Sequence, residues 1–428
     1  MNKILRNLLI AALAVSANAS AYTNKTHMQL RNQALRNLPL EQTTTKERTV
    51  AKLEDRFGGT LSVTGFYGQT TNAKEAGKYF GCNNKNEVKL GAATDDLSIA
   101  NVVGAGTTDA TVKFDPEVIS YGVNLGYYQD LSKIINGLNL KVSVPVERVE
   151  NDLKMKVSGT DKDKVVTYFK GGAVTGQEAL KYAKIDGKCS TTGVANVDVQ
   201  LGYRFLDKEA YNAGLNIGVV VPTGKELKGV YAFEPQVGSN HWGLGAGLDA
   251  QARVWGGDEH NVKLNFATNY RYMFEATEKR TLGLKDVNWA QYHRNNAATS
   301  VPVANLLTLD VNATPGSQLD SILGLAYNNG GFAADLGYNM YFAEQESVKT
   351  KGVITNPTLS GAATAATVDA TAAETPAQFT HSIYGGLGYA TKTWEYPVMV
   401  GLGGKYEMAS RNSAMDGWQG WAKLGLSF

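Results

Sequence analysis

The 428-residue sequence has few cysteines, no clustered histidines and no second long apolar run. Beyond the first 21 residues no window offers about 18 uninterrupted apolar residues, so no transmembrane helix is predicted in the mature chain. Two cysteines are too few for a structural zinc site, and the five histidines have no metal-ligand spacing. A net charge of +2 is far from the basic character of nucleic-acid-binding proteins. We therefore predict no metal, no cofactor and no nucleic-acid partner.

The composition instead favours strands. The chain has 46 glycines and 21 tyrosines but only 10 prolines, and its mean hydropathy is −0.24. That value is too polar for a helical membrane protein. It suits a transmembrane β-barrel, in which residues of the lumen and loops dilute the lipid-facing ones.

Residues 1–19 have the form of a secretory signal peptide. Two basic residues precede the apolar run 8–15, and a small-residue cleavage site follows. A second site two residues further on leaves Ser20 or Tyr22 as the first mature residue. The sequence thus predicts export from the cytoplasm.

Residues 20–56 differ from the rest of the chain. Four apolar residues have the spacing of one or two helical turns: Met28, Leu30, Leu35 and Leu38. We predict a short amphipathic helix over about 26–37, followed by a charged connection. This segment could act as a plug inside a barrel, make a periplasmic contact, or be a loosely ordered leader.

The last stretch, 417–428, alternates at the strand period of two. One face carries Trp418, Leu424, Leu426 and other apolar residues, whereas the opposite face is polar or small apart from Trp421. The terminal Phe428 resembles the assembly signal of bacterial outer-membrane barrels. The resemblance implies insertion into outer-membrane lipid by the barrel-assembly machinery.

The same alternation recurs from residue 57 onward. Twelve stretches show it: 61–67, 119–127, 138–147, 197–205, 213–221, 242–254, 262–274, 321–328, 332–342, 381–390, 396–408 and 417–428. Their connections alternate between short and long, as periplasmic turns and external loops do in bacterial barrels. We predict an all-β fold over 57–428, an antiparallel up-and-down barrel of about 12 strands in the outer membrane. Residues 303–311 also read as a strand, which we assign to the fourth long loop.

The apolar face must point outward, because the other face is too charged for a dry core. The predicted pore-lining residues are Lys141, Glu147, Asp198, Gln200, Arg204, Asp249, Gln251, Arg253, Lys263, Arg271, Asp335 and Lys423. Such a mixture of signs could set the electric field and width of a pore. It could equally pair across the barrel and fill it.

The two cysteines fall in the first two long loops. Cys82 and Cys189 would emerge on the same side of the barrel after passage through an oxidising periplasm. We predict a disulfide between them.

Two neighbouring segments, 215–224 and 238–247, pair a strand ending in Pro-Thr-Gly with a glycine-rich strand. They resemble outer-membrane proteins of the phenol-degradation meta-pathway, which are related to long-chain fatty-acid transporter barrels. The resemblance implies a channel for small, hydrophobic solutes.

An enzyme is not predicted, since a catalytic site would need a histidine beside a carboxylate or serine and only His241 is a vague candidate. We predict a porin-like channel for passive uptake of small solutes. The alternative is a structural or adhesive surface barrel with a plugged lumen.

Overall fold

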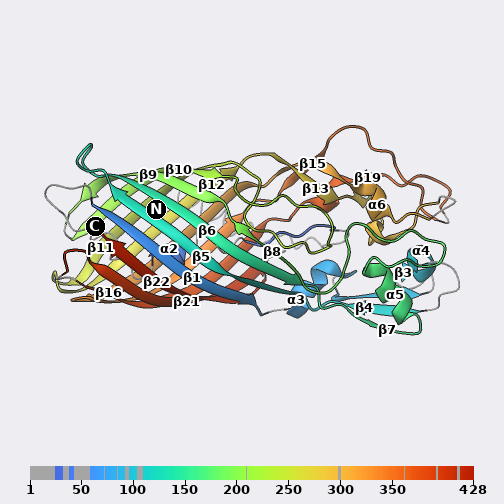
Figure 1. Cartoon of the computed structure of the whole chain (residues 1–428), viewed down its shortest axis with the longest axis horizontal. Helices are drawn as coiled ribbons and strands as arrows, with labels where there is room; N and C mark the ends of the chain where they lie inside the picture. Colours follow the sequence, from blue (N-terminus) through green and yellow to red (C-terminus); the bar gives the residue numbers. More distant parts are fainter. Residues whose placement is uncertain are drawn as a thin grey trace, which may run out of the picture.

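The computed structural model is a closed, twelve-stranded antiparallel β-barrel that continues into a folded extracellular part (Figure 1). The structure describes residues 25–31, 38–42, 58–71, 73–83, 85–91, 96–103, 109–208, 210–296, 300–360, 362–391, 394–411 and 415–428. The barrel strands are β1 (Gly59–Thr70), β5 (Glu117–Asp130), β6 (Leu138–Asp152), β9 (Val197–Asp207), β10 (Tyr211–Val221), β11 (Gly243–Gly256), β12 (His260–Met273), β16 (Gly316–Asn329), β17 (Phe332–Ala343), β20 (Gln378–Ala390), β21 (Val398–Arg411) and β22 (Gly417–Ser427).

The barrel closes between its first and last strands. β1 pairs with β22 from Thr60 opposite Ser427 to Thr70 opposite Gly417. The terminal Phe428 extends this ladder, since its N–H donates to the Gly59 carbonyl at 2.9 Å. All twelve predicted strands are confirmed, and the fold class with them. Both termini of the strand series lie at the short-turn, periplasmic end.

The outer surface of the barrel is apolar. Its exposed aliphatic residues include Leu61, Val63, Leu215, Ile217, Leu323, Leu325, Leu336, Leu387, Leu402, Leu424 and Leu426. Exposed aromatic residues mark both ends of this band: Tyr67, Tyr121, Tyr272, Tyr406 and Trp418 near the loops, and Phe205, Tyr211, Trp255, Tyr327 and Tyr389 near the turns. An apolar band between two aromatic girdles identifies an outer-membrane barrel.

The long loops fold into small sheets beyond the membrane. One contains β2 (Glu87–Gly91), β3 (Leu97–Ser98), β4 (Ala110–Lys113) and β7 (Lys156–Ser158); a second contains β13 (Ala276–Thr281), β15 (Thr308–Thr314) and β18 (Ser347–Thr350); a third contains β14 (Gly283–Leu284) and β19 (Val368–Asp369). β8 (Cys189–Val194) pairs with the upper part of β6. The helices are α3 (Ala73–Phe80), α4 (Ile99–Val103), α5 (Lys162–Phe169), η3 (Ala290–Tyr292), α6 (Val303–Leu307) and η4 (Ala370–Ala373).

These loops share a buried aromatic core. Phe169 packs edge-on against Tyr292, with ring centroids 4.8 Å apart, and against Trp289 at 5.6 Å. Phe80 packs on Phe233 at 5.0 Å. Residues 303–311, assigned from sequence to the fourth long loop, do lie there as α6 and the start of β15. They stay outside the barrel sheet, so the count of twelve is unchanged.

Two expectations from sequence fail. The described part of the predicted helix 26–37 has no helical turn; the helix found here is α2 (Leu38–Gln42), a few residues later. Residues 25–31 are extended, because their backbone groups form hydrogen bonds with the barrel and the loops. The predicted signal peptide lies outside the described residues. No described helix is long and apolar enough to cross a membrane.

The second failure is the disulfide, since Cys82 and Cys189 are both free thiols. Cys82 is buried in the extracellular core. The Cys189 Sγ donates to the carbonyls of Asn151 at 3.4 Å and Phe233 at 3.5 Å. Each thiol is therefore held by its own surroundings, and burial raises the pKa of both to about 12.

Candidate functional site

The lumen is built by the inward-facing residues of the strands. All twelve residues predicted to line a pore lie at inward positions, and none of them is exposed. Glu147, Asp198, Gln200, Arg271 and Lys423 are buried. Strand alternation explains this placement, since each predicted residue has lipid-facing neighbours on either side.

Several of these wall residues pair with one another. The Arg271 Nη2 lies 3.7 Å from the Asp198 Oδ2 on the inner face of the barrel. The Gln200 amide donates to the same carboxylate at 3.1 Å. Lys263 donates to Gln251 at 3.3 Å. Near the periplasmic turn, Arg253 pairs with Asp258. The mixture of charges thus compensates locally.

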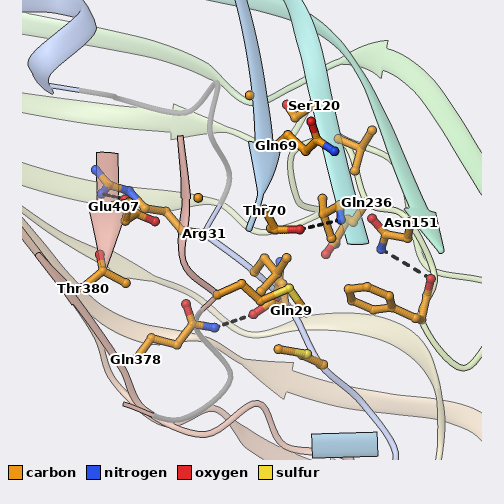
Figure 2. Close-up of a pocket in the computed structure, with 18 of the residues that line it drawn as sticks. Gln29, Arg31, Gln69, Thr70, Ser120, Asn151, Gln236, Gln378, Thr380 and Glu407 are labelled. Atoms are coloured by element: carbon orange, nitrogen blue, oxygen red, sulfur yellow. Dashed lines mark hydrogen bonds and ion pairs between the residues drawn. The ribbon is translucent and has the colours of Figure 1, made fainter. Parts of the chain in front are cut away.

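Sequence reasoning did not predict a buried polar group inside the barrel that is centred on Arg31. The Arg31 guanidinium donates to Asp320 of β16 at 3.0 Å, to Glu407 of β21 at 2.9 Å and to Asn339 of β17 at 3.2 Å. It also lies 4.3 Å from the ring centroid of Tyr341. All of these side chains are buried, so the N-terminal segment is anchored inside the barrel (Figure 2).

The outer end of this segment is held by the extracellular loops. The Thr26 N–H donates to the Ala372 carbonyl at 2.9 Å, and its hydroxyl donates to the Thr281 carbonyl at 2.5 Å. The Tyr79 hydroxyl and the Gln378 amide donate to the carbonyls of residues 27 and 29. These bonds account for the extended backbone of 25–31.

The inner end of the segment packs on an apolar patch of the lumen wall. Leu38 and Leu40 of α2 are buried in a cluster whose wall members include Phe66, Ala267, Ile322, Tyr384 and Trp421. Below this cluster Lys423 donates to the Glu41 carbonyl at 3.3 Å. Trp421, the one large apolar residue on the inward face of the last strand, therefore has its partner in α2.

Glycines on neighbouring strands make room for these wall aromatics. A Cβ at Gly337 would lie 2.4 Å from the Tyr384 hydroxyl, and one at Gly403 would lie 2.5 Å from the Trp421 ring. A glycine of β11 makes room for polar side chains in the same way, because a Cβ at Gly247 would lie 2.2 Å from the Asn269 side chain. Inward glycines thus allow large side chains to lie flat against the wall.

Four cavities adjoin the described N-terminal segment and wall. The outer cavity, of about 100 Å³, lies beside residues 27–31 and is lined by Glu147, and a second of about 70 Å³ is lined by Arg271. Below them, a cavity of about 90 Å³ beside α2 is lined by Lys141, Asp198, Gln200 and Lys423, and one of about 20 Å³ by Lys141, Gln200, Arg204 and Asp249. Gln251, Arg253, Lys263 and Asp335 line none of the four.

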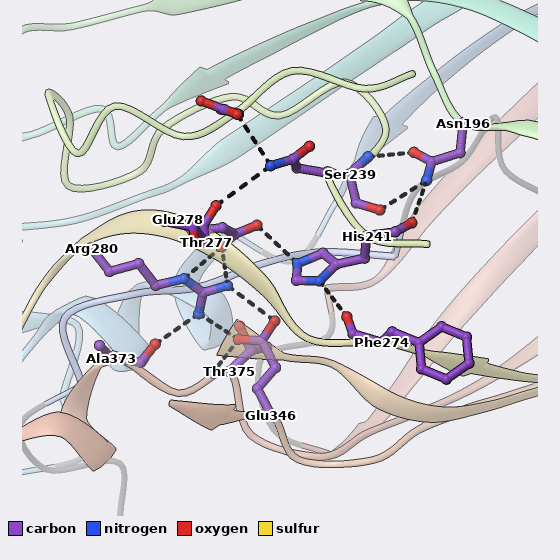
Figure 3. Close-up of polar contacts among 12 residues, drawn as sticks. Asn196, Ser239, His241, Phe274, Thr277, Glu278, Arg280, Glu346, Ala373 and Thr375 are labelled. Atoms are coloured by element: carbon purple, nitrogen blue, oxygen red, sulfur yellow. Dashed lines mark hydrogen bonds and ion pairs between the residues drawn. The ribbon is translucent and has the colours of Figure 1, made fainter. Parts of the chain in front are cut away.

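A buried ionic cluster lies at the extracellular rim (Figure 3). His241 contacts Glu278 at 3.0 Å and the Phe274 carbonyl at 2.7 Å, while Arg280 bridges Glu278 and Glu346. Burial alone would raise the pKa of Glu278, but the charge of Arg280 and the hydrogen bond with His241 hold it below its usual range. Both His241 and Glu278 have side chains that are 0% exposed. His241, which sequence reasoning named as a vague catalytic candidate, thus joins loops in the protein interior.

The N-terminal segment approaches this rim cluster through His27. Burial, together with the charge of Arg280, lowers the pKa of His27 to about 4. Burial by itself would raise the pKa of Glu346, but Arg280 lowers it. The rim is therefore arranged around a neutral His27 and an ionised Glu346.

The closed sheet, apolar exterior and polar lumen define a transmembrane barrel of the outer-membrane type. No known family model matches the chain, and no curated protein sequence matches it. Solved structures similar in fold include an outer membrane channel from Pseudomonas putida F1, at 10% identity and a TM-score of 0.45, covering 87% of this chain and 96% of that one. They also include the Pseudomonas putida toluene transporter TodX, at 10% identity and 0.39, covering 95% and 94%. A third is the β domain of the Bordetella autotransporter BrkA, at 11% and 0.33, covering 87% and 100%.

A Pseudomonas aeruginosa homologue of FadL is also among these neighbours.

Proposed function

We propose that the chain is an outer-membrane channel through which small solutes, including hydrophobic ones, diffuse passively. In this proposal residues 1–19 direct export, 20–56 form a segment inside the lumen, and 57–428 form the barrel. Outer-membrane lipid and the barrel-assembly machinery are its expected partners, and no catalytic activity is expected.

The observation that supports the proposal is the series of lumen cavities. Two lie on the extracellular side beside residues 27–31, and two lie beside or below α2. The walls of these cavities carry paired charged side chains and also apolar side chains. An ion and an uncharged solute would therefore each pass both polar and apolar groups. A twelve-stranded barrel is intermediate in width between filled eight-stranded barrels and open porins.

The test is single-channel conductance in planar lipid bilayers. The refolded mature chain should give small, discrete steps with weak ion selectivity, because the lumen carries both signs of charge. A correctly folded barrel that never conducts and never passes a neutral solute into liposomes would contradict the proposal.

A second function, a surface barrel with a plugged lumen, is favoured by the anchoring of the N-terminal segment. Arg31 bonds to three strands, and Leu38 and Leu40 are buried against the wall. Deleting 22–56 separates the two functions. A sharp rise from zero conductance would support a permanent plug, whereas a modest increase over an already conducting chain would support a channel that the segment only narrows.

A further inference from the structure

The outer cavity contains polar side-chain atoms that no protein group satisfies. Both amide atoms of Gln236, the Asn151 Oδ1 and the Thr380 hydroxyl are buried without a hydrogen-bond partner and belong to residues lining this cavity (Figure 2). They come from separate elements: the loop after β10, β6 and β20. Buried polar groups of this kind normally find a partner, so these atoms are ready to bond to a molecule that enters the cavity.

The charged side chains around the same cavity have polar partners, and Glu147 among them accepts a hydrogen bond from the Ser120 hydroxyl at 3.3 Å. Glu407 accepts hydrogen bonds from both Arg31, at 2.9 Å, and Lys405, at 3.3 Å. Glu234 accepts from the Lys228 N–H at 3.1 Å, and burial raises its pKa, which favours the neutral acid. A charged solute would have to displace one of these partners and lose its own hydration. An uncharged solute would not.

Another part of the cavity wall is apolar. Met28 and Leu30 of the N-terminal segment face Val118, Val149 and Phe233 around it. Its volume of about 100 Å³ is of the order that accommodates a single aromatic ring. The cavity therefore offers an apolar compartment for the body of a small molecule and a polar side for its head group.

We propose that the outer cavity is a binding site for small uncharged amphipathic solutes whose head group is both a hydrogen-bond donor and an acceptor, of which a primary amide is the simplest. The Gln236 side chain has one free donor group and one free acceptor, and a second amide matches both at once. A hydrocarbon of the same size leaves these atoms unpaired and binds more weakly. The site deepens the proposed channel function and rests on it for the route by which solute arrives.

The test compares benzamide, toluene and benzoate, which share one ring and differ in the head group. The full mature chain in lipid nanodiscs is titrated with each compound and followed by saturation-transfer NMR, with empty nanodiscs subtracted. We expect benzamide to bind at least about tenfold more tightly than toluene or benzoate. Equal binding of benzamide and toluene, or preferential binding of benzoate, would overturn the proposal.

Variants assign the binding to this cavity. Gln236→Leu and Thr380→Val keep side-chain size and remove the polar atoms, so each should weaken benzamide binding while toluene binding is kept or improved. Gln345→Leu is the matched control, since Gln345 is an exposed loop residue away from the cavity. Barrel folding of each variant is checked by the mobility shift between unheated and boiled samples. If folded Gln236→Leu binds benzamide like the parent chain, the proposed site is wrong.

The result is distinguishable from failure of the channel function. Benzamide binding without conductance would leave the site in a barrel that is not a channel. Conductance without selective benzamide binding would support the channel function and contradict the proposed binding site.

Discussion

Arg31 donates to Glu407 at 2.9 Å, so a residue near the start of the chain is ion-paired with one 376 positions later, in the penultimate strand. The same guanidinium pairs with Asp320 at 3.0 Å. Both carboxylates are buried, and a buried carboxylate is costly without a cationic partner. This anchor is what places the N-terminal segment across the lumen.

Replacing Arg31 by methionine should release the segment. The change leaves Glu407 and Asp320 with one partner fewer, and removing one member of a buried ion pair costs about 3–5 kcal/mol. We expect faster cleavage of the segment by added protease and higher conductance, with an intact barrel. Arg253→Met is the control, because its partner Asp258 is exposed in a periplasmic turn. Unchanged protease resistance in Arg31→Met would show that the anchor lies elsewhere.

Leu38→Ala should loosen the inner end of the segment. Leu38 is 1% exposed against wall aromatics, and truncating a buried leucine costs about 2–5 kcal/mol. Because the strands themselves keep their pairing, we expect increased solvent quenching of a fluorophore on the segment and no change in barrel unfolding. Leu402→Ala, on the lipid face, provides the comparison. A loss of barrel stability equal to the loss of docking would argue that α2 is part of the barrel core.

Gly337→Ala should destabilise the barrel, because the new methyl group would lie 2.4 Å from the Tyr384 hydroxyl. Overpacking of this kind typically costs about 1–3 kcal/mol. The midpoint of urea unfolding should fall, and adding Tyr384→Leu should recover part of the loss, since the methyl group also lies 2.8 Å from the Leu323 carbonyl oxygen. Gly65→Ala is the matched control, since nothing lies within 4 Å of a Cβ there. Equal effects of the two alanines would rule out the contact with Tyr384.

Acid should weaken docking of the segment at the rim. The pKa of His27 falls from 6.5 to about 4 on burial beside Arg280, so between these values the released segment binds a proton that the docked one does not. Docking then weakens by up to about 1.4 kcal/mol per pH unit as the pH falls through this window.

The measurement is the protease sensitivity of the segment at pH 7 and pH 5. Sensitivity should increase at pH 5 in the parent chain and change little in His27→Asn, which cannot be protonated there. An identical pH response in both chains would assign the effect to other groups.

The cysteines should remain free. Both thiols are held by their surroundings, and burial raises their pKa to about 12, which suppresses the reactive thiolate. Mass spectrometry of the alkylated, unreduced protein should find both thiols after unfolding and few modified before it. A Cys82–Cys189 crosslink in the purified protein would contradict the structure.

The barrel can be predicted from local patterns in the sequence. The alternation in 417–428 separates lipid-facing Leu424 and Leu426 from lumen-facing Lys423, because a strand sends neighbouring side chains to opposite faces whatever its partners are. The tight Asn-Asn-Gly-Gly turn at 328–331 and the other short connections then order the strands. These signals are local, and the chain repeats them twelve times.

How the lumen is filled depends on contacts between residues that are distant in the sequence. Arg31, Asp320 and Glu407 are far apart in sequence, and Asp320 lies just outside the predicted strand 321–328. Residues 26–31 have helical spacing, yet their backbone bonds to loops and wall, which keeps them extended. The inward Phe66 and Trp421 were the signal that something apolar occupies the lumen. Closure of the barrel brings residues from distant strands to the same height along the barrel axis. Their distance in the linear sequence gives no sign of this proximity.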